Sequence, residues 1–90
     1  MKFERESITF REAKKAKDDI EVAVRNGDFV LDFEGVRHID STVLALSLYT
    51  LRKAKKAGRT LRIQAAPEGF ADLIKLYGLE TLLMPALEKA

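Results

Sequence analysis

The stretch from Phe29 to Gly58, FVLDFEGVRHIDSTVLALSLYTLRKAKKAG, decides the fold of this chain. It opens with an alternating apolar segment in which Phe29, Leu31 and Phe33 share one face, as in a strand. A Glu-Gly turn follows, and then a long apolar segment ends at Gly58, the usual residue after a helix. The stretch therefore predicts a strand, a tight turn and a helix.

A polar cluster, Asp40-Ser41-Thr42, stands where the predicted helix begins. A helix start exposes unpaired N–H groups and carries a partial positive charge, so it favours carboxylates and other anions. Asp, Ser and Thr are preferred N-cap residues, and an ordinary cap is one interpretation of the cluster. The other interpretation is a functional surface, where a hydroxyl contacts a partner or is phosphorylated.

Strands and helices also alternate before this stretch. Lys2 to Arg5 predicts a short strand, and Thr9 with Glu12 forms the pattern of a capping box. A helix that ends at Gly27 follows. Its predicted apolar face comprises Phe10, Ala13, Ala16, Ile20, Ala23 and Val24.

After Gly58 the pattern predicts a third strand and a third helix. Thr60 to Ala65 alternates, and its inward residues are expected to be Leu61, Ile63 and Ala65. Pro67 suits the first turn of a helix that Gly78 ends, with an apolar face of Phe70, Leu73, Ile74 and Tyr77. Leu79 to Leu83 predicts a short helix or turn broken by Pro85, and the tail from Ala86 to Ala90 is expected to fray.

The alternation of strands and helices predicts an α/β fold. Residues 1–90 are expected to form a single domain with a small mixed, mostly parallel sheet and helices packed on it. The polar cluster from Asp40 to Thr42 would follow the carboxyl end of a strand, where open α/β sheets place their sites.

The composition limits the classes of function. With 90 residues, a chain buries roughly 60–65% of its unfolded surface, enough for one core but not for a deep cleft. The net charge of +2 favours no partner class, and the absence of cysteine excludes disulfides and thiolate metal sites. No metal site or cofactor is expected. The charged N-terminus and the lack of a long apolar run predict a cytoplasmic chain that is not inserted in a membrane.

The pattern LDFEGVRHIDST, followed by an apolar helix ending in LRKAKKAG and another strand, resembles the STAS domain, the fold of anti-sigma factor antagonists. The match covers nearly all of the chain after residue 7. Leu44-Ala45-Leu46 and Leu76-Tyr77-Gly78-Leu79 resemble the MlaB branch in particular. The resemblance implies a STAS-like sheet whose N-terminal strands are abbreviated in this chain.

The two branches imply different partners. In the MlaB branch the domain is not an enzyme: it binds and supports the cytoplasmic ATPase of an ABC transporter that moves phospholipid and maintains outer-membrane lipid asymmetry. This resemblance implies a partner-binding set of Asp40, Ser41, Thr42, Leu44 and Ala45, and a location at the inner membrane through the partner. The alternative is an anti-sigma factor antagonist that a partner kinase phosphorylates at Thr42 or Ser41. A designed or edited STAS-like scaffold is a further, weaker alternative.

One residue departs from the family pattern. Val43 stands where the family usually has a small residue, and its β-branched side chain is expected to narrow the approach of a partner. An independent enzyme is disfavoured because no nucleophile elbow or oxyanion donor accompanies Ser41, and His38 is expected to be a surface histidine. The basic run from Arg52 to Lys56 lacks interleaved aromatic residues, so it predicts a solvated helix end and no nucleic-acid site.

Overall fold

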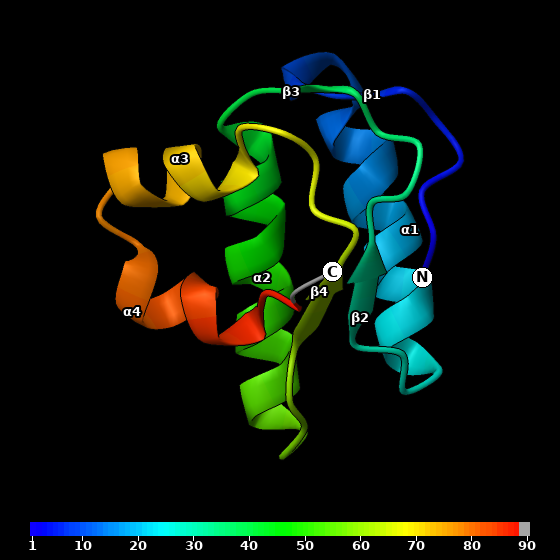
Figure 1. Ribbon diagram of the computed structural model, residues 1–90. Coiled ribbons are helices and arrows are strands. Elements are labelled where there is room, and N and C mark those ends of the chain that lie inside the picture. The colour runs from blue at the N-terminus through cyan, green and yellow to red at the C-terminus, as the bar shows by residue number, and fades with distance from the viewer. Residues whose placement is uncertain (89–90) are drawn as a thin grey trace.

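Short strands alternate with helical crossovers along the chain (Figure 1). The computed structural model describes residues 1–88. The strands are β1 (Ser7–Ile8), β2 (Val30–Asp32), β3 (His38–Ile39) and β4 (Arg62–Gln64). The helices are α1 (Ala13–Arg25), α2 (Thr42–Lys56), α3 (Phe70–Leu76) and α4 (Glu80–Leu83), with 3₁₀ turns η1 (Phe10–Glu12) and η2 (Met84–Ala86).

All strand pairings within residues 1–88 are parallel. β1 pairs with β3, and β2 pairs with β4. Isolated bridges extend the pairing on both sides, with Lys2 beside Asp32 and Leu87 beside Ile63. The bridges and the β2–β4 pair give the order N-terminal segment, β2, β4 and Leu87, while β3 pairs with β1 further along the N-terminal segment. The predicted α/β fold with a mostly parallel sheet is confirmed, and within residues 1–88 every pairing is parallel because helical crossovers join the neighbours.

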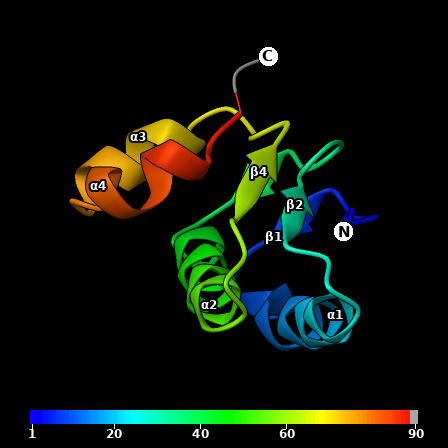
Figure 2. The same cartoon turned by 90° about the horizontal axis from the view of Figure 1, so that it is seen from below.

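The helices α1 and α2 lie side by side against one face of β2 and β4, and α3 and α4 lie beside α2 (Figure 2). Crossovers of one hand place successive helices on the same face when the strand order follows the chain. The face that meets the helices is apolar and buried, and comprises Phe29, Leu31, Phe33, Leu61 and Ile63. The opposite face is partly or fully exposed, and comprises Val30, Asp32, Arg62 and Gln64.

An aromatic cluster lies at the centre of the core. The ring of Phe33, 1% exposed, stacks on Phe3 at 5.3 Å and packs against Phe70 at 5.4 Å between centroids. In α2, the buried hydroxyls of Ser47 and Thr50 donate hydrogen bonds to main-chain carbonyls one turn earlier, at 2.7 and 2.8 Å. These bonds allow two polar residues to lie in the core without an unpaired donor.

The first helix begins as the sequence predicts. The capping box is present: Glu12 Oε1 accepts the Thr9 N–H at 2.8 Å, and the Thr9 hydroxyl faces the helix N–H groups. Gly27, with φ of +79°, ends α1. The prediction for Phe10 is wrong, because its side chain is 72% exposed. Phe10 lies in η1, whose three-residue turn takes it out of the 3.6-residue stripe that buries Ala16 and Ile20.

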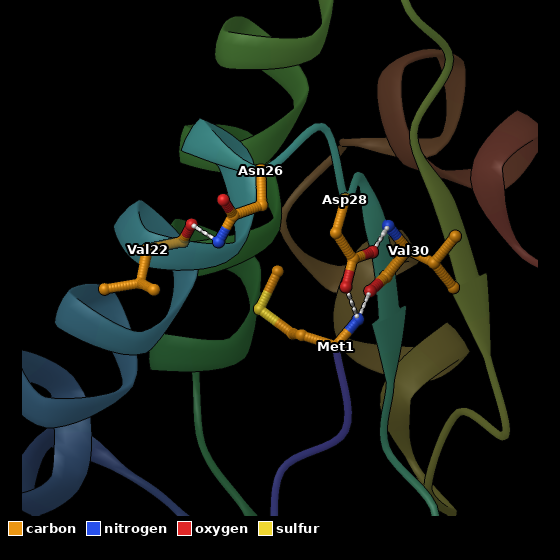
Figure 3. Close-up of polar contacts among 5 residues, drawn as sticks. All are labelled: Met1, Val22, Asn26, Asp28 and Val30. Atoms are coloured by element: carbon orange, nitrogen blue, oxygen red, sulfur yellow. Dashed lines mark hydrogen bonds and ion pairs between the residues drawn. The ribbon is translucent and has the colours of Figure 1, made fainter.

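The N-terminal strand lies later than expected. Regular pairing is found at Ser7–Ile8, whereas Lys2 makes only an isolated bridge. The chain before β1 is anchored by its first residue (Figure 3). The Met1 amino group lies 2.6 Å from Asp28 Oδ2 and also donates to the Val30 carbonyl, and Asp28 Oδ1 accepts the Val30 N–H at 3.0 Å.

The C-terminal part corrects four expectations. Ala65 is exposed with φ of +52°, so it leaves the strand. Pro67 lies before α3 in a turn, and its carbonyl accepts the Phe70 N–H at 3.1 Å.

Tyr77 follows the end of α3 and is 55% exposed. The tail does not fray at Ala86, which is 9% exposed, nor at Leu87, which pairs with β4. Residues 89–90 lie outside the described part of the chain.

Candidate functional site

Asp40 fixes the start of α2. Its Oδ1 accepts the N–H of Thr42 at 2.8 Å, and its main-chain carbonyl accepts the N–H of Val43 at 3.2 Å. Its Oδ2 accepts the N–H of Phe10 at 3.1 Å. One carboxylate therefore satisfies a free donor at the helix start and ties α2 to η1 across 30 positions of sequence.

The same contacts keep Asp40 ionised. Partial burial acts to raise the pKa of the carboxyl, but hydrogen bonding from the side chain and N–H of Thr42, and from the N–H of Phe10, outweighs it. The pKa of Asp40 is therefore lowered from its ordinary value. The negative charge also interacts favourably with the positive end of the α2 dipole.

Ser41 is the exposed member of the cluster. It is the first residue before α2, yet its hydroxyl makes no capping hydrogen bond, because Asp40 supplies that acceptor. Thr42 is half-buried at the first position of the helix. The interpretation of the cluster as a cap thus applies to Asp40, while Ser41 is exposed and its hydroxyl makes no capping hydrogen bond, which leaves it available to a partner.

Two neighbouring residues lie in the core. Leu44 is 3% exposed, so the prediction that it contacts a partner is wrong. Val43 is fully buried, so its branched side chain does not narrow the approach to Ser41, contrary to expectation. The helical repeat explains both results, because α2 turns these positions toward the sheet. Ala45 is exposed, as a contact residue requires.

Phe10 is a surface residue beside this cluster that sequence reasoning assigned to the core. Its N–H is bonded to Asp40, and the guanidinium carbon of Arg11 lies 5.9 Å from the centre of its exposed ring. Exposed aromatic rings are enriched at the centres of protein interfaces. The capping box at Thr9 was the one sequence signal of this exposure. It places Phe10 in the first turn of the helical segment, before the apolar stripe of α1 begins.

A groove between α1 and α2 continues from the cluster. Its lining includes Lys14 and Lys17 from α1 together with Thr42, Ala45, Tyr49 and Arg52 from α2. We call it the α1–α2 groove. Two of the predicted contact residues, Thr42 and Ala45, therefore lie on one continuous surface with basic side chains from a helix that the sequence did not connect to them.

A second hollow, beside α3, includes His38. Its other lining residues are Arg37, Ile39, Glu68, Gly69, Asp72, Leu73 and Leu76. His38 is exposed, as predicted. Within residues 1–88, no group of three or more His, Asp or Glu side chains is placed to bind a metal ion. None of the helices in that range has both the length and the apolar character needed to cross a membrane.

Acid is expected to destabilise this fold. Hydrogen bonding by Thr9 lowers the pKa of Glu12. Burial acts to raise the pKa of Asp28, but the Met1 ammonium group and the Val30 N–H outweigh it, so the pKa of Asp28 is lowered, like that of Asp40. Each group stabilises the fold fully above its unfolded-state pKa of about 4, and this contribution is lost as pH falls through the lower native pKa.

Urea unfolding at a series of pH values tests this expectation. The free energy of unfolding should fall steadily from about pH 5 to about pH 2. The double variant Asp28→Asn/Asp40→Asn should show a smaller fall, because two of the shifted carboxyls are removed. Equal pH slopes for the two proteins would show that these carboxyls contribute nothing.

One of the comparisons with known proteins identifies a family. A family model described as the MlaB STAS domain matches residues 5–85, nearly the whole chain. Comparison with curated proteins gave no match, and comparison with solved structures gave none. The matched range contains the parallel strands, the Asp40 helix start and both helices of the α1–α2 groove. This chain therefore belongs to the STAS domain family and is MlaB-like.

Proposed function

We propose that this chain is a non-enzymatic subunit that binds and supports the cytoplasmic ATPase of an ABC phospholipid transporter. The transporter would maintain outer-membrane lipid asymmetry, and the chain would lie in the cytoplasm, at the inner membrane through its partner. The match to the MlaB STAS domain model supports this proposal, because the resemblance to the MlaB branch implies such an ATPase as the partner.

The exposed hydroxyl of Ser41 at a fixed helix start is the observation that carries the proposal. Asp40 holds this start in place through two main-chain N–H groups, so the hydroxyl is presented without a large cost in conformational entropy on binding. Phe10 supplies an exposed aromatic ring next to it. A polar contact beside an aromatic anchor is the composition expected of a small protein interface.

The contact would take a modest part of the surface. A standard interface buries about 800 Å² on each partner, which is about one seventh of the 5713 Å² that the domain exposes. Ala45 and Thr42 extend the surface along α2 from Ser41.

The anti-sigma factor antagonist is less well supported. A phosphate on Thr42 would carry about two negative charges into the neighbourhood of the Asp40 carboxylate, whose Oδ1 already bonds the Thr42 N–H. The repulsion would oppose the contacts that fix the helix start. Phosphorylation of Thr42 or Ser41 therefore stays a prediction, which mass spectrometry after incubation with a partner kinase and ATP can check.

Ser41→Glu is expected to weaken binding to the purified ATPase of an Mla-type transporter by about tenfold or more, because a charge replaces a small hydroxyl at the contact. Isothermal titration calorimetry measures the change. The variant should fold normally, because a carboxylate is favourable at a helix N-terminus. Thr60→Glu is the matched control, since it puts the same charge on an exposed hydroxyl beyond the other end of α2. Equal affinity for Ser41→Glu and wild type would count against this surface.

A further inference from the structure

Four basic side chains gather around one tyrosine. Lys14, Lys17 and Arg52 line the α1–α2 groove with Tyr49, and Lys53 adjoins the ring from the next turn of α2. None of the ion pairs found in residues 1–88 includes any of these four cations. None of the described residues that line the groove is acidic. The groove therefore concentrates positive charge that no ion pair within residues 1–88 neutralises.

Tyr49 lies at the centre of this charge. The Nζ atoms of Lys17 and Lys53 lie 5.2 and 5.4 Å from its ring centre. Its hydroxyl donates a hydrogen bond to Glu21 at 3.1 Å, and Glu21 also faces Arg25 at 4.0 Å. The Glu21 carboxylate is therefore engaged by Tyr49 and Arg25, and the cations Lys14, Lys17 and Arg52 are exposed.

The floor of the groove is apolar. Ala13, Ala45 and Leu46 contribute it, and the two alanines are small enough to admit side chains of another molecule. The groove measures about 480 Å³. Its upper end is Thr42, so it is continuous with the surface around Ser41. A hollow lined by apolar and basic side chains fits a peptide segment that carries both apolar and acidic side chains.

We propose that the α1–α2 groove binds an acidic segment of the partner protein, with carboxylates toward Lys14, Lys17 and Arg52 and small apolar side chains on the floor. This rests on the proposed function, because it identifies which part of the ATPase subunit meets the domain. Charge complementarity carries the argument: like charges gathered in a hollow repel one another, and an acidic segment relieves that repulsion.

An anionic membrane fits the same charge less well. The cations line a hollow between two helices, where a flat bilayer surface cannot reach them all at once. A binding experiment with vesicles separates the two partners.

The probe is a synthetic peptide that repeats Glu-Glu-Leu-Ala, acetylated and amidated so that only its side chains are charged. Amide chemical shifts should move along α1 and α2 at the groove. Affinity should fall as salt rises from about 0.1 M to about 1 M, because the Debye length drops from about 10 Å to about 3 Å. A Gln-Gln-Leu-Ala peptide should bind at least about tenfold more weakly, because its side chains carry no charge.

Lys17→Glu/Arg52→Glu is the decisive variant. It should lower affinity for the acidic peptide by about tenfold or more, since two attractions become repulsions. Lys15→Glu/Lys55→Glu makes the same change of charge on the same two helices outside the groove, and should leave affinity within about twofold of wild type. Equal binding by both double variants would overturn the proposal. So would binding to phosphatidylglycerol vesicles with none to the peptide.

The ATPase separates this proposal from the proposed function. Loss of ATPase binding in both Ser41→Glu and Lys17→Glu/Arg52→Glu supports both. If only Ser41→Glu loses ATPase binding, the groove proposal is overturned and the subunit assignment stays in place. If every variant binds the ATPase as tightly as wild type, neither Ser41 nor the α1–α2 groove belongs to the binding surface. No binding by wild type to an Mla-type ATPase overturns the subunit assignment, and the peptide titration then still decides whether the groove takes acidic segments.

Discussion

Phe33→Ala is expected to lower the free energy of unfolding by about 3–5 kcal/mol. The ring of Phe33 is 1% exposed and lies between Phe3 and Phe70, so its removal leaves a cavity that the helices and strands cannot close. A chain of 90 residues has a total stability of about 5–13 kcal/mol. The variant should therefore be partly unfolded at warm temperatures, which urea or thermal unfolding followed by circular dichroism measures.

Phe10→Ala is the matched control. It deletes the same side chain from a position that is 72% exposed, and should change the free energy of unfolding by less than about 0.5 kcal/mol. It should nevertheless weaken binding to the partner if Phe10 is an interface anchor. A Phe33→Ala protein as stable as Phe10→Ala would contradict the aromatic cluster as the centre of the core.

Asp40→Ala is expected to cost about 1–2 kcal/mol of stability, at the upper end of the range for a lost N-cap. The variant leaves the N–H of Thr42 and of Phe10 without their acceptor, and releases η1 from the start of α2. Partner binding should fall as well, because the Ser41 hydroxyl is no longer held in one place. Urea unfolding and calorimetry with the ATPase measure the two effects.

Asp40→Asn separates the cap from the charge. Asparagine keeps an acceptor oxygen and is itself a good N-cap, so its cost should be smaller than that of alanine. The difference between wild type and Asp40→Ala should also shrink below about pH 4, as the Asp40 carboxyl takes up a proton and loses acceptor strength. A constant difference at every pH would assign the effect to packing alone.

Local chemistry made much of the fold predictable. The capping box of Thr9 and Glu12 is a contact over three positions, and the helix-ending glycines Gly27 and Gly58 need only their own positive φ. The alternation of Leu61 with Arg62 is likewise local, because neighbouring residues in a strand point to opposite faces. The start of α2 at the polar cluster follows from the same kind of rule.

The candidate site depended on contacts that local rules do not contain. The bond from the N–H of Phe10 to Asp40 joins residues 30 positions apart, and it places Phe10, whose side chain is exposed, beside the start of α2. The burial of Leu44 depends on how α2 rotates against the sheet. The α1–α2 groove needs Lys17 to meet Tyr49 across two helices, a pairing that the packing of α1 on α2 creates.

The strand order has a consequence for how the domain is made. The sheet grows in the order of the chain, from the N-terminal segment through β2 and β4 to Leu87. A ribosome releases the chain in that same order, so each new strand finds its neighbour already in place and no earlier strand has to be displaced. Among the strand pairings of residues 1–88, the last to form is that of Leu87 with β4. Until Leu87 emerges, that edge of β4 is the growing end of the sheet and the part of the nascent domain most open to pairing with another chain.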